Sequence, residues 1–309
     1  MFSWEKYFKK IVCRENITYD DEYLYEYNGF YTNSPIIYIY RNKNDIELDS
    51  NLPMPPTNSF EYMFNGCKSL SNIDALSNWD TSNIENMTGM FFDCYSLTDI
   101  NALSNWDTSN VKDMNSMFYN CESLSNINGL NNWDVSNVKN LSSMFFNCKS
   151  LSNINDLNDW DTINVKYMDS MFFNCKSLSN INGLSNWDVR NVEDMNFIFS
   201  NCKSLSNIDG LSNWDVRNVE YMDSMFFNCK SLSNINGLKS WNTSNVKNLQ
   251  NMFYDCKSLS NIDGLKSWNT KNIKNMNDMF YNCRSLKYYP KKLDELKSFT
   301  SKIMNDFYL

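Results

Sequence analysis

A tryptophan, a phenylalanine and a cysteine recur every 27 residues along most of this 309-residue chain. Nine cysteines, from Cys67 to Cys283, follow this spacing, and so do eight tryptophans, from Trp79 to Trp268, with no insertion in between. A fixed period of this length is typical of a solenoid, in which each repeat buries its apolar face only by stacking on its neighbours. The repeat therefore predicts one elongated domain.

Within each repeat, the spacing of the apolar residues changes from helix-like to strand-like. One stripe has the i, i+3, i+4, i+7 spacing of a short helix: Met87, Met90, Phe91 and Cys94. Ser82 or Asn83 is in position to cap that helix. The segment after the cysteine, SLTDI or SLSNI, predicts a short strand closed by turn residues, and a second extended piece runs through the tryptophan. The expected fold class is an α/β repeat, a leucine-rich-repeat-like solenoid of 27-residue coils built from short strands and a short helix.

The two ends of the chain differ from the repeats, as the capping of a solenoid requires. Residues 1–58 are rich in tyrosine, and an Asn-Gly turn between extended segments predicts a small N-terminal β cap. Residues 59–289 form the solenoid, with one partial and eight tandem repeats. Residues 290–309 place apolar side chains near one helical face, which predicts a C-terminal cap helix. A docking tail for another protein is the alternative for this last segment.

Composition argues against several classes of function. The net charge of −8 disfavours a nucleic-acid partner, and no apolar stretch is long enough for a signal peptide core or a membrane span. The chain has no histidine, no Walker loop and no Rossmann glycine motif, so we expect no enzyme and no cofactor. Chance carboxylate pairs are the one catalytic arrangement that the sequence leaves open.

The cysteine ladder predicts a buried, reduced core rather than a metal site or a set of disulfides. Zinc sites need clustered Cys or His ligands, and this chain has no histidine and no Cys-x-x-Cys pair. Packed helices lie about 8–10 Å apart, which is too far for a disulfide between their backbones. Cys13 lies outside the ladder and has no assigned role.

An asparagine recurs at one position in all eight full copies, from Asn83 to Asn272, while the residue before it varies. We expect this asparagine to cap the helix and to satisfy backbone groups at a turn. A glycan or calcium site is the alternative. The neighbouring acidic column, which begins at Asp80, changes to Asn242 and Asn269 in the last two copies. A hydrogen-bond acceptor tolerates that change better than a calcium ligand does.

Three middle coils differ together from the others at positions outside the core. Arginine replaces serine in one column, tyrosine replaces Asn or Asp four residues later, and in one coil phenylalanine replaces Gly or Ser seven residues after the arginine. Offsets of four and seven lie on one face of a helix, so the sequence predicts an exposed patch of a composition enriched at protein interfaces. Neutral drift at solvent positions is the alternative. The candidate patch is Ile163, Tyr167, Arg190, Phe197, Arg217 and Tyr221.

A second candidate is an aromatic column interrupted by Ser200: Phe92, Tyr119, Phe146, Phe173, Phe227, Tyr254 and Tyr281. These rings either pack between coils or offer a binding surface. Because Phe197 lies in the coil that has Ser200, its ring is a candidate substitute for the missing one.

The repeat WDTSNVKDMNSMF, followed by C-x-S-L-x-x-I, resembles the BspA-like leucine-rich repeat family and is also similar to viral tryptophan-repeat families. The resemblance covers residues 60 to 289 and implies a leucine-rich-repeat solenoid used for adhesion or protein binding. It carries over only the fold and the broad class of function.

The function expected from the sequence is a non-enzymatic, monomeric, protein-binding scaffold in the cytoplasm, with no membrane span and an unidentified partner. The alternative, which the family resemblance implies, is an exported adhesin or structural protein of the cell surface.

Overall fold

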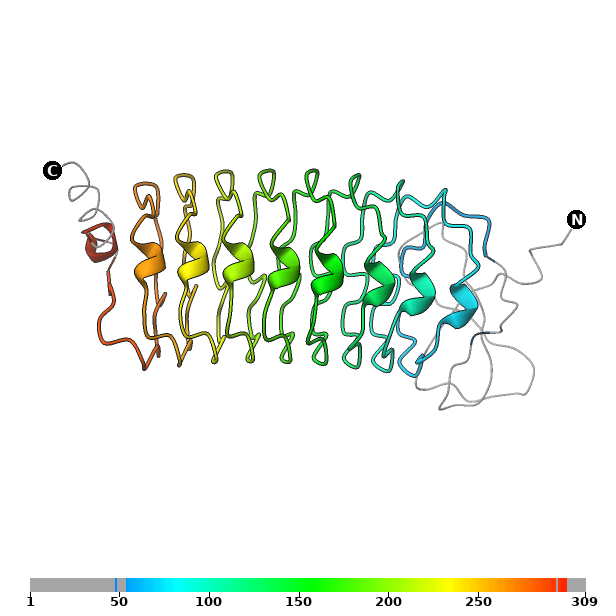
Figure 1. Ribbon diagram of the computed structural model, residues 1–309, viewed down its shortest axis with the longest axis horizontal. Coiled ribbons are helices and arrows are strands. Elements are labelled where there is room, and N and C mark those ends of the chain that lie inside the picture. Colours follow the sequence, from blue (N-terminus) through cyan, green and yellow to red (C-terminus); the bar gives the residue numbers. More distant parts are fainter. Residues whose placement is uncertain (1–47, 49–53, 293, 299–309) are drawn as a thin grey trace, which may run out of the picture.

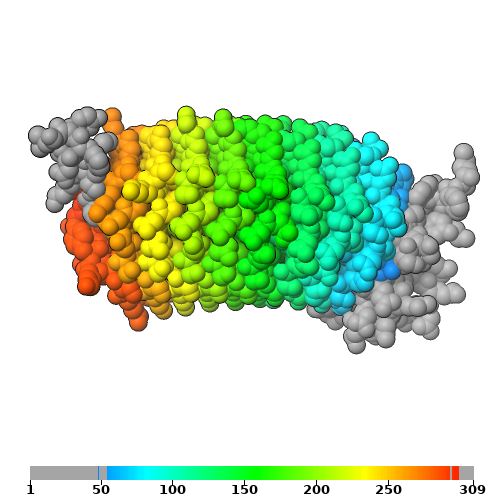
Figure 2. Space-filling view, in the orientation of Figure 1, coloured from blue at the N-terminus to red at the C-terminus, as the bar shows by residue number. Residues whose placement is uncertain are grey.

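The computed structural model describes residues 48, 54–292 and 294–298 of the chain. Consecutive repeats lie side by side in one row of coils, with the first repeat at one end and the last at the other (Figure 1). The atoms of neighbouring coils are in contact along the whole row (Figure 2). The predicted repeat solenoid is therefore confirmed. Nearly all of the N-terminal β cap predicted for residues 1–58 lies outside the described residues.

Each full repeat contains one three-residue 3₁₀ helix, and these helices form a column along the solenoid (Figure 1). They are η2 (Asp74–Leu76), η3 (Asn101–Leu103), η4 (Asn128–Leu130), η5 (Asn155–Leu157), η6 (Asn182–Leu184), η7 (Asp209–Leu211), η8 (Asn236–Leu238) and η9 (Asp263–Leu265). Asn72 Oδ1 accepts a hydrogen bond of 2.7 Å from the N–H of Asp74, and this Asx turn starts η2. Residues 294–298 are helical and lie within the segment for which a cap helix was expected.

The stripe of Met, Phe and Cys that the spacing assigns to a helix is not helical. In the coil of Met87, alternate N–H groups bond within the coil and to the next coil: that of Met90 donates to Met87 O at 3.2 Å, and that of Phe91 donates to Met117 O at 2.8 Å. A helix would direct every N–H along its own axis. The stripe is instead a string of β-turns, and the prediction of a short helix in each coil is wrong.

Two residues of each turn string adopt a left-handed backbone conformation. In the second coil these are Gly89 (φ 57°) and Asp93 (φ 61°), and the equivalent residues of most other coils are Ser, Asn or Asp. Asn, Asp and Gly are the residues that adopt this conformation most readily. The asparagine or aspartate before each cysteine is therefore the sequence signal for a turn string instead of a helix.

Strand pairing within the described residues is limited to single parallel bridges. Nine positions form what we call the bridge column, in which each residue pairs with its equivalent in the next coil: Ser59, Asn86, Asp113, Asn140, Tyr167, Asp194, Tyr221, Asn248 and Asn275. The strand predicted after each cysteine contributes only the bridges Asp99–Asn126 and Asn180–Asn207. Because local turns use every second N–H, bridges do not extend into strands.

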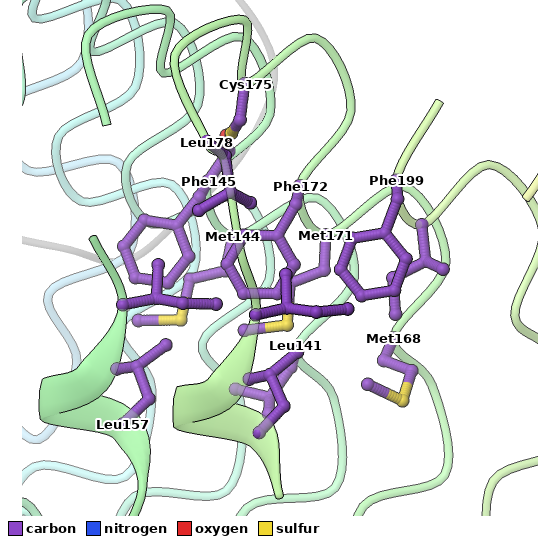
Figure 3. Packing of buried hydrophobic residues seen from close by; sticks show 14 of the residues in the cluster. Leu141, Met144, Phe145, Leu157, Met168, Met171, Phe172, Cys175, Leu178 and Phe199 are labelled. Carbon is purple, nitrogen blue, oxygen red and sulfur yellow. The ribbon is translucent and has the colours of Figure 1, made fainter. Parts of the chain in front are cut away.

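Equivalent side chains stack on one another in the core (Figure 3). The rings of Phe145 and Phe172 lie 5.6 Å apart and within 9° of parallel, and the same arrangement continues to Phe199. The buried tryptophans also stack, and each of the last seven satisfies its indole N–H on the previous coil, as Trp160 Nε1 does on Leu130 O at 3.0 Å. The core is thus a set of columns, and those of phenylalanine, tryptophan and cysteine each contain one type of side chain.

Eight cysteines, from Cys94 to Cys283, are free and buried, as predicted. Each thiol donates a hydrogen bond to a phenylalanine carbonyl of the previous coil, as Cys175 Sγ does to Phe145 O at 3.2 Å. Cys67 is disulfide-bonded, so the expectation of a fully reduced ladder is wrong at this position. Cys67 belongs to the partial first repeat, where the spacing argument made for stacked coils does not apply on the N-terminal side.

We expect the eight buried thiols to resist alkylation in the native protein and to react completely after denaturation. Burial raises the pKa of the Cys202 thiol to about 12, because the core does not solvate a thiolate. Iodoacetamide labelling of native and urea-denatured protein, followed by mass spectrometry of each cysteine peptide, measures this difference. Rapid labelling of any of the eight in the native state would contradict the buried ladder.

The same shift in pKa predicts alkaline instability. Such a thiol ionises near pH 9 in the unfolded protein and near pH 12 in the folded protein. Its contribution to the free energy of unfolding is complete below pH 9 and is lost progressively as the pH rises toward 12. Each buried thiol should lower the free energy of unfolding by about 1.4 kcal/mol for every pH unit in that window. Urea midpoints measured at pH 7, 9 and about 10.5 should fall only at the last value, and Cys202→Ala should reduce the slope.

An amide ladder runs beside the cysteines from Cys94 to Cys283, through the Asn or Asp that precedes each of these eight. Asn147 Nδ2 donates to Asn120 Oδ1 at 2.7 Å, and the pattern repeats between most neighbouring coils. The ladder is broken at Asp255, which has no amide group to donate. Asn228 Oδ1 is consequently buried without a hydrogen-bond partner among the described residues.

We therefore expect Asp255→Asn to stabilise the protein by about 1 kcal/mol, because it supplies the missing donor to Asn228 Oδ1. The contacts of Asp255 with Lys230 and Lys257 are long, at 3.9 and 3.5 Å, and both lysine side chains are more than a third exposed, so their loss should matter little. Urea denaturation measures the change. Asp93→Asn is the matched control, because the preceding residue in its column is Gly66, which has no side-chain acceptor. An equal gain in the control would contradict the explanation.

Candidate functional site

The six residues of the predicted patch do not share a helical face, because their coils contain no such helix. The structure divides them into two groups. Arg190, Arg217 and Ile163 occupy the turn after the tryptophan in three consecutive coils, whereas Tyr167 and Tyr221 belong to the bridge column. Phe197 follows the bridge column by three residues. The prediction of one helical surface is therefore wrong, because the residues form two groups with separate contacts.

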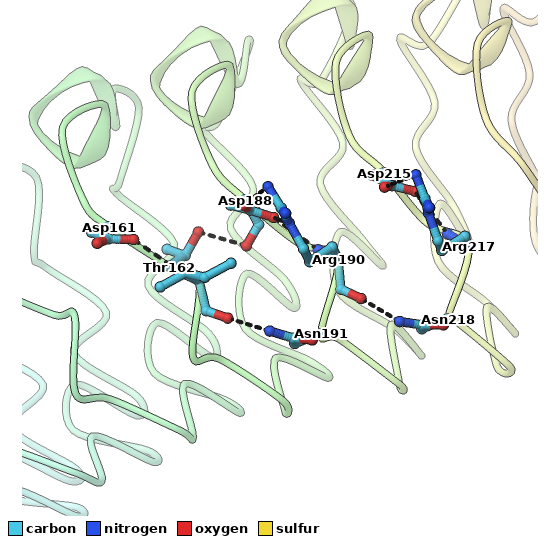
Figure 4. Close-up of polar contacts among 9 residues, drawn as sticks. Asp161, Thr162, Asp188, Arg190, Asn191, Asp215, Arg217 and Asn218 are labelled. Carbon is cyan, nitrogen blue, oxygen red and sulfur yellow. Dashed lines mark hydrogen bonds and ion pairs between the residues drawn. The ribbon is translucent and has the colours of Figure 1, made fainter.

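The two arginines are held by aspartates of their own coils (Figure 4). Arg190 binds Asp188 through two contacts, Nε to Oδ1 at 2.9 Å and Nη2 to Oδ2 at 2.6 Å, and Arg217 binds Asp215 in the same way. The hydrogen bond from the Arg190 side chain lowers the pKa of Asp188 below its ordinary value. Both guanidinium groups are exposed to solvent but already paired.

The asparagine that recurs in every full repeat, from Asn83 to Asn272, also has a structural role at this turn. Asn191 Nδ2 donates to the Ile163 carbonyl, and Asn218 Nδ2 donates to the Arg190 carbonyl, each at 2.7 Å (Figure 4). The acidic column starts the same turn, because Asp188 Oδ1 also accepts the N–H of Arg190 at 3.2 Å. The prediction that these asparagines satisfy backbone groups at a turn is confirmed, although they cap no helix.

The second group consists of aromatic residues that lie next to one aspartate. Tyr167, Asp194 and Tyr221 are consecutive members of the bridge column, so their side chains leave three neighbouring coils in a row. The tyrosines are 46% and 42% exposed, and Asp194 lies half-buried between them. Phe197 is 38% exposed, and its N–H donates at 3.0 Å to the carbonyl of Asp223, which is two residues beyond Tyr221. We call Tyr167, Asp194, Phe197 and Tyr221 the aromatic–acidic patch.

Both tyrosines replace residues that stabilise the turn in other coils. The usual Asn or Asp of the bridge column accepts the N–H two residues later, as Asp194 Oδ1 does from Asn196 at 2.8 Å. A tyrosine cannot reach that group, and the N–H of Asp169 makes no hydrogen bond within the described part of the chain. The tyrosine at position 167 is therefore present at the expense of a local hydrogen bond.

Phe197 also departs from the local preference. Its φ of 58° lies in the left-handed region, where the neighbouring coils have serine. This conformation costs a residue with a bulky side chain about 1–2 kcal/mol. Unfavourable local choices that persist at one exposed place are more typical of functional sites than of drift.

The carboxylate of Asp194 and the two carboxylates near it, Asp169 and Asp223, form no ion pair with any described residue. Their hydrogen bonds come from neutral donors: Asp194 Oδ1 accepts the N–H of Asn196, Asp169 Oδ1 accepts Ser142 Oγ at 2.6 Å, and Asp223 Oδ1 accepts Asn248 Nδ2 at 3.0 Å. Burial raises the pKa of Asp194, and the nearby charges of Asp169 and Asp223 raise it further. The patch therefore combines exposed rings with uncompensated negative charge.

The second candidate column consists of stacked rings that are half-buried, except for Tyr281 at its end, which is exposed. Neighbouring rings from Phe92 to Phe173 lie 4.3 to 4.5 Å apart and nearly parallel, and Phe227, Tyr254 and Tyr281 form a second stack. Ser200 separates the two stacks and is 1% exposed. Phe197 takes part in none of the ring–ring contacts found among the described residues, so its ring does not replace the missing one. This column packs the coils together.

The sequence matches a known family model in four overlapping segments, residues 56–150, 96–207, 125–231 and 205–304. That family is described as a Mycoplasma protein of unknown function, DUF285. The chain belongs to the DUF285 family. Because the family description states no activity, the function of this DUF285 solenoid must be argued from its own surface. No curated protein sequence matches the chain.

Several solved structures of leucine-rich repeat proteins are similar to this DUF285 chain at low identity. A T. pallidum leucine-rich repeat protein is 18% identical, with a TM-score of 0.31, over 70% of this chain and 74% of its own. A leucine-rich repeat protein from Eubacterium ventriosum is 15% identical, with a TM-score of 0.36, over 75% and 82%. A leucine-rich cell surface protein from Faecalibacterium prausnitzii is 15% identical, with a TM-score of 0.27, over 87% and 94%. These scores are too low to support an argument about function.

The described part of the DUF285 chain offers neither a metal site nor a membrane-spanning helix. No group of three or more Cys, Asp or Glu residues there is arranged to hold a metal ion. None of the helices described is long and apolar enough to cross a membrane. The aromatic–acidic patch is therefore the candidate site with the strongest structural support.

We expect Tyr167→Asn and Phe197→Asn each to stabilise the protein by about 0.5–1.5 kcal/mol. The first substitution supplies an acceptor for the N–H of Asp169, and the second places a residue that tolerates the left-handed conformation. Urea denaturation of each variant measures the gain. Tyr167→Phe is the matched control, because phenylalanine cannot accept the hydrogen bond, and its stability should be unchanged. A loss of stability in both Asn variants would show that the rings serve packing.

Proposed function

We propose that this DUF285 chain is a non-enzymatic scaffold that binds a protein partner through the aromatic–acidic patch. One observation carries the proposal: within the described residues, the interior coils expose large aromatic side chains only at Tyr167, Phe197 and Tyr221. The other exposed large hydrophobic residues are Tyr62, Tyr281 and Tyr288, at the ends of the described repeats. Exposed aromatic clusters of this kind are typical of protein interfaces.

The stacking of the coils supports this role because it keeps the surface rigid. The N–H of Met195 donates to Tyr221 O at 3.0 Å and that of Phe197 to Asp223 O at 3.0 Å, so the backbone is fixed between the coils that present the rings. A pre-organised surface loses little conformational entropy when it binds. Arg190 and Arg217 lie in two of the same coils, but their charges are already paired with Asp188 and Asp215, so they are not part of the proposed surface.

The class of function and the cellular location are also part of this proposal. The BspA-like repeat motif favours protein binding or adhesion as the broad class. A cytoplasmic scaffold remains our proposal for the location, and an exported surface adhesin remains the alternative implied by the family resemblance. Neither changes which residues are expected to contact the partner.

The test compares capture of a partner by the wild-type protein and by the triple variant Tyr167→Asn, Phe197→Asn, Tyr221→Asn, which introduces a turn-forming residue used at these positions in other coils. Photo-crosslinking in the source cells, followed by mass spectrometry, should identify a protein bound to the wild type and lost from the variant. Native stability of the variant, measured by urea denaturation, separates lost binding from lost folding.

Arg190→Ser combined with Arg217→Ser is the matched control, because it introduces the serine found in other coils at a neighbouring exposed turn. We expect this double variant to retain most of the partner. Undiminished capture by the folded triple variant would exclude the patch as the binding surface, and a role for the solenoid that does not use these rings would then have to be sought.

A further inference from the structure

We propose that Tyr167, Asp194 and Tyr221 form a receptor for a lysine or arginine side chain of the protein partner. This inference rests on the proposed function, since it states the chemistry by which the scaffold would recognise its partner. The occupant is a basic side chain from an exposed protein segment, and Phe197 provides an apolar contact for the residue next to it.

The register of the coils sets the size of the receptor. Parallel bridges join Tyr167 to Asp194 and Asp194 to Tyr221. Adjacent chains in a parallel ladder are about 4.8 Å apart, so the backbones of the two tyrosines are separated by roughly 9.6 Å. That separation leaves room above Asp194 for one ammonium or guanidinium group. Such a group can lie within ~6 Å of the centroid of each tyrosine ring.

The carboxylate of Asp194 has bonding capacity to spare. Its Oδ1 accepts the N–H of Asn196 at 2.8 Å, whereas its Oδ2 accepts no hydrogen bond from any described residue. A half-buried carboxylate oxygen between two rings is best satisfied by a charged donor. An apolar occupant would leave this oxygen unpaired, and an anionic occupant would be repelled.

The same column contains a natural comparison at Asp113. There the neighbouring members are Asn86 and Asn140, and Asn140 Nδ2 donates to Asp113 Oδ2 at 3.3 Å. In that coil the side chain of the next coil occupies the position in which we place the basic group of the partner. At Asp194 both neighbours in the column are tyrosines, which have no amide group to donate, so the second oxygen stays available between two aromatic residues.

The charges around Tyr167, Asp194 and Tyr221 favour a cation as the occupant of the receptor. Asp169 and Asp223 lie close enough to Asp194 to affect its ionisation, and none of the three forms an ion pair with a described residue. The nearby basic side chain of Lys247 is already bound to Glu220, with Nζ and Oε2 separated by 2.5 Å. Lys166, next to Tyr167, is in no ion pair among the described residues. The aspartates of this region are therefore open to a basic side chain that approaches from solvent.

The experiment uses a synthetic probe, the amidated peptide acetyl-Gly-Phe-Arg-Gly, and its twin with citrulline in place of arginine, which has nearly the same shape without the charge. Ligand-observed NMR measures the affinity of both peptides for the full-length protein. We expect saturable binding of the arginine peptide and none of the citrulline peptide. Asp194→Asn should weaken binding about tenfold, and Tyr167→Asn or Tyr221→Asn about two- to fivefold each.

Asp113→Asn is the matched control, because it removes the same charge from the bridge column without altering Tyr167, Asp194 or Tyr221. It should leave the affinity unchanged. Three outcomes overturn the proposal: absence of saturable arginine binding, equal binding of the citrulline peptide, or equal weakening by Asp113→Asn and Asp194→Asn. The last outcome would indicate attraction to the net negative charge of the chain as a whole.

The failure of this inference can be distinguished from failure of the scaffold. If the triple aromatic variant loses its partner in cells while Asp194→Asn retains full capture, the patch binds a protein but not through a basic side chain. If both variants retain the partner, the proposed function itself is wrong.

Discussion

The alternation of backbone hydrogen bonds is the constraint on which the rest of this solenoid depends. In the turn string, one N–H closes a local turn and the next donates to the following coil, as Met90 and Phe91 do. Every coil must therefore present the same carbonyl at the same height, which explains why the 27-residue period has no insertion. Like side chains then stack on like, and the phenylalanine, tryptophan, cysteine and asparagine columns all follow from that registration.

Much of this architecture could be predicted from sequence, and the error has a definable cause. The period alone indicated a solenoid, and the columns that face the core were identified correctly. The helix was wrong because the spacing of Met87, Met90 and Phe91 suits a string of β-turns as well as a helix. Apolar periodicity does not report the sign of φ. The Asn or Asp before each cysteine carries that information, since Asp93 and its equivalents are left-handed.

At the candidate site too, spacing in the sequence indicates the unusual positions, whereas the stacking register of the coils determines which of them are neighbours in space. Departures from the repeat predicted exposed aromatic side chains in three middle coils, and Tyr167, Phe197 and Tyr221 are exposed. Helical offsets grouped them with the arginines, whereas the bridge column groups the tyrosines with Asp194, a residue that looks ordinary in its own repeat. In a stacked solenoid, positions that differ by multiples of the period are the spatial neighbours, and that rule could have found Asp194 without coordinates.

The likeness of one coil to the next has a consequence for how such a gene can change. Because each coil bonds to both neighbours through the same backbone groups, gain or loss of a whole 27-residue unit by unequal recombination would leave every remaining contact of the same kind. Length is thus free to drift in the uniform parts of the array. Between positions 167 and 221, one additional coil would separate Asp194 from one of its two tyrosines, and the proposed receptor would be lost. Lineages that keep this spacing while varying in total repeat number would carry the record of selection on three adjacent coils.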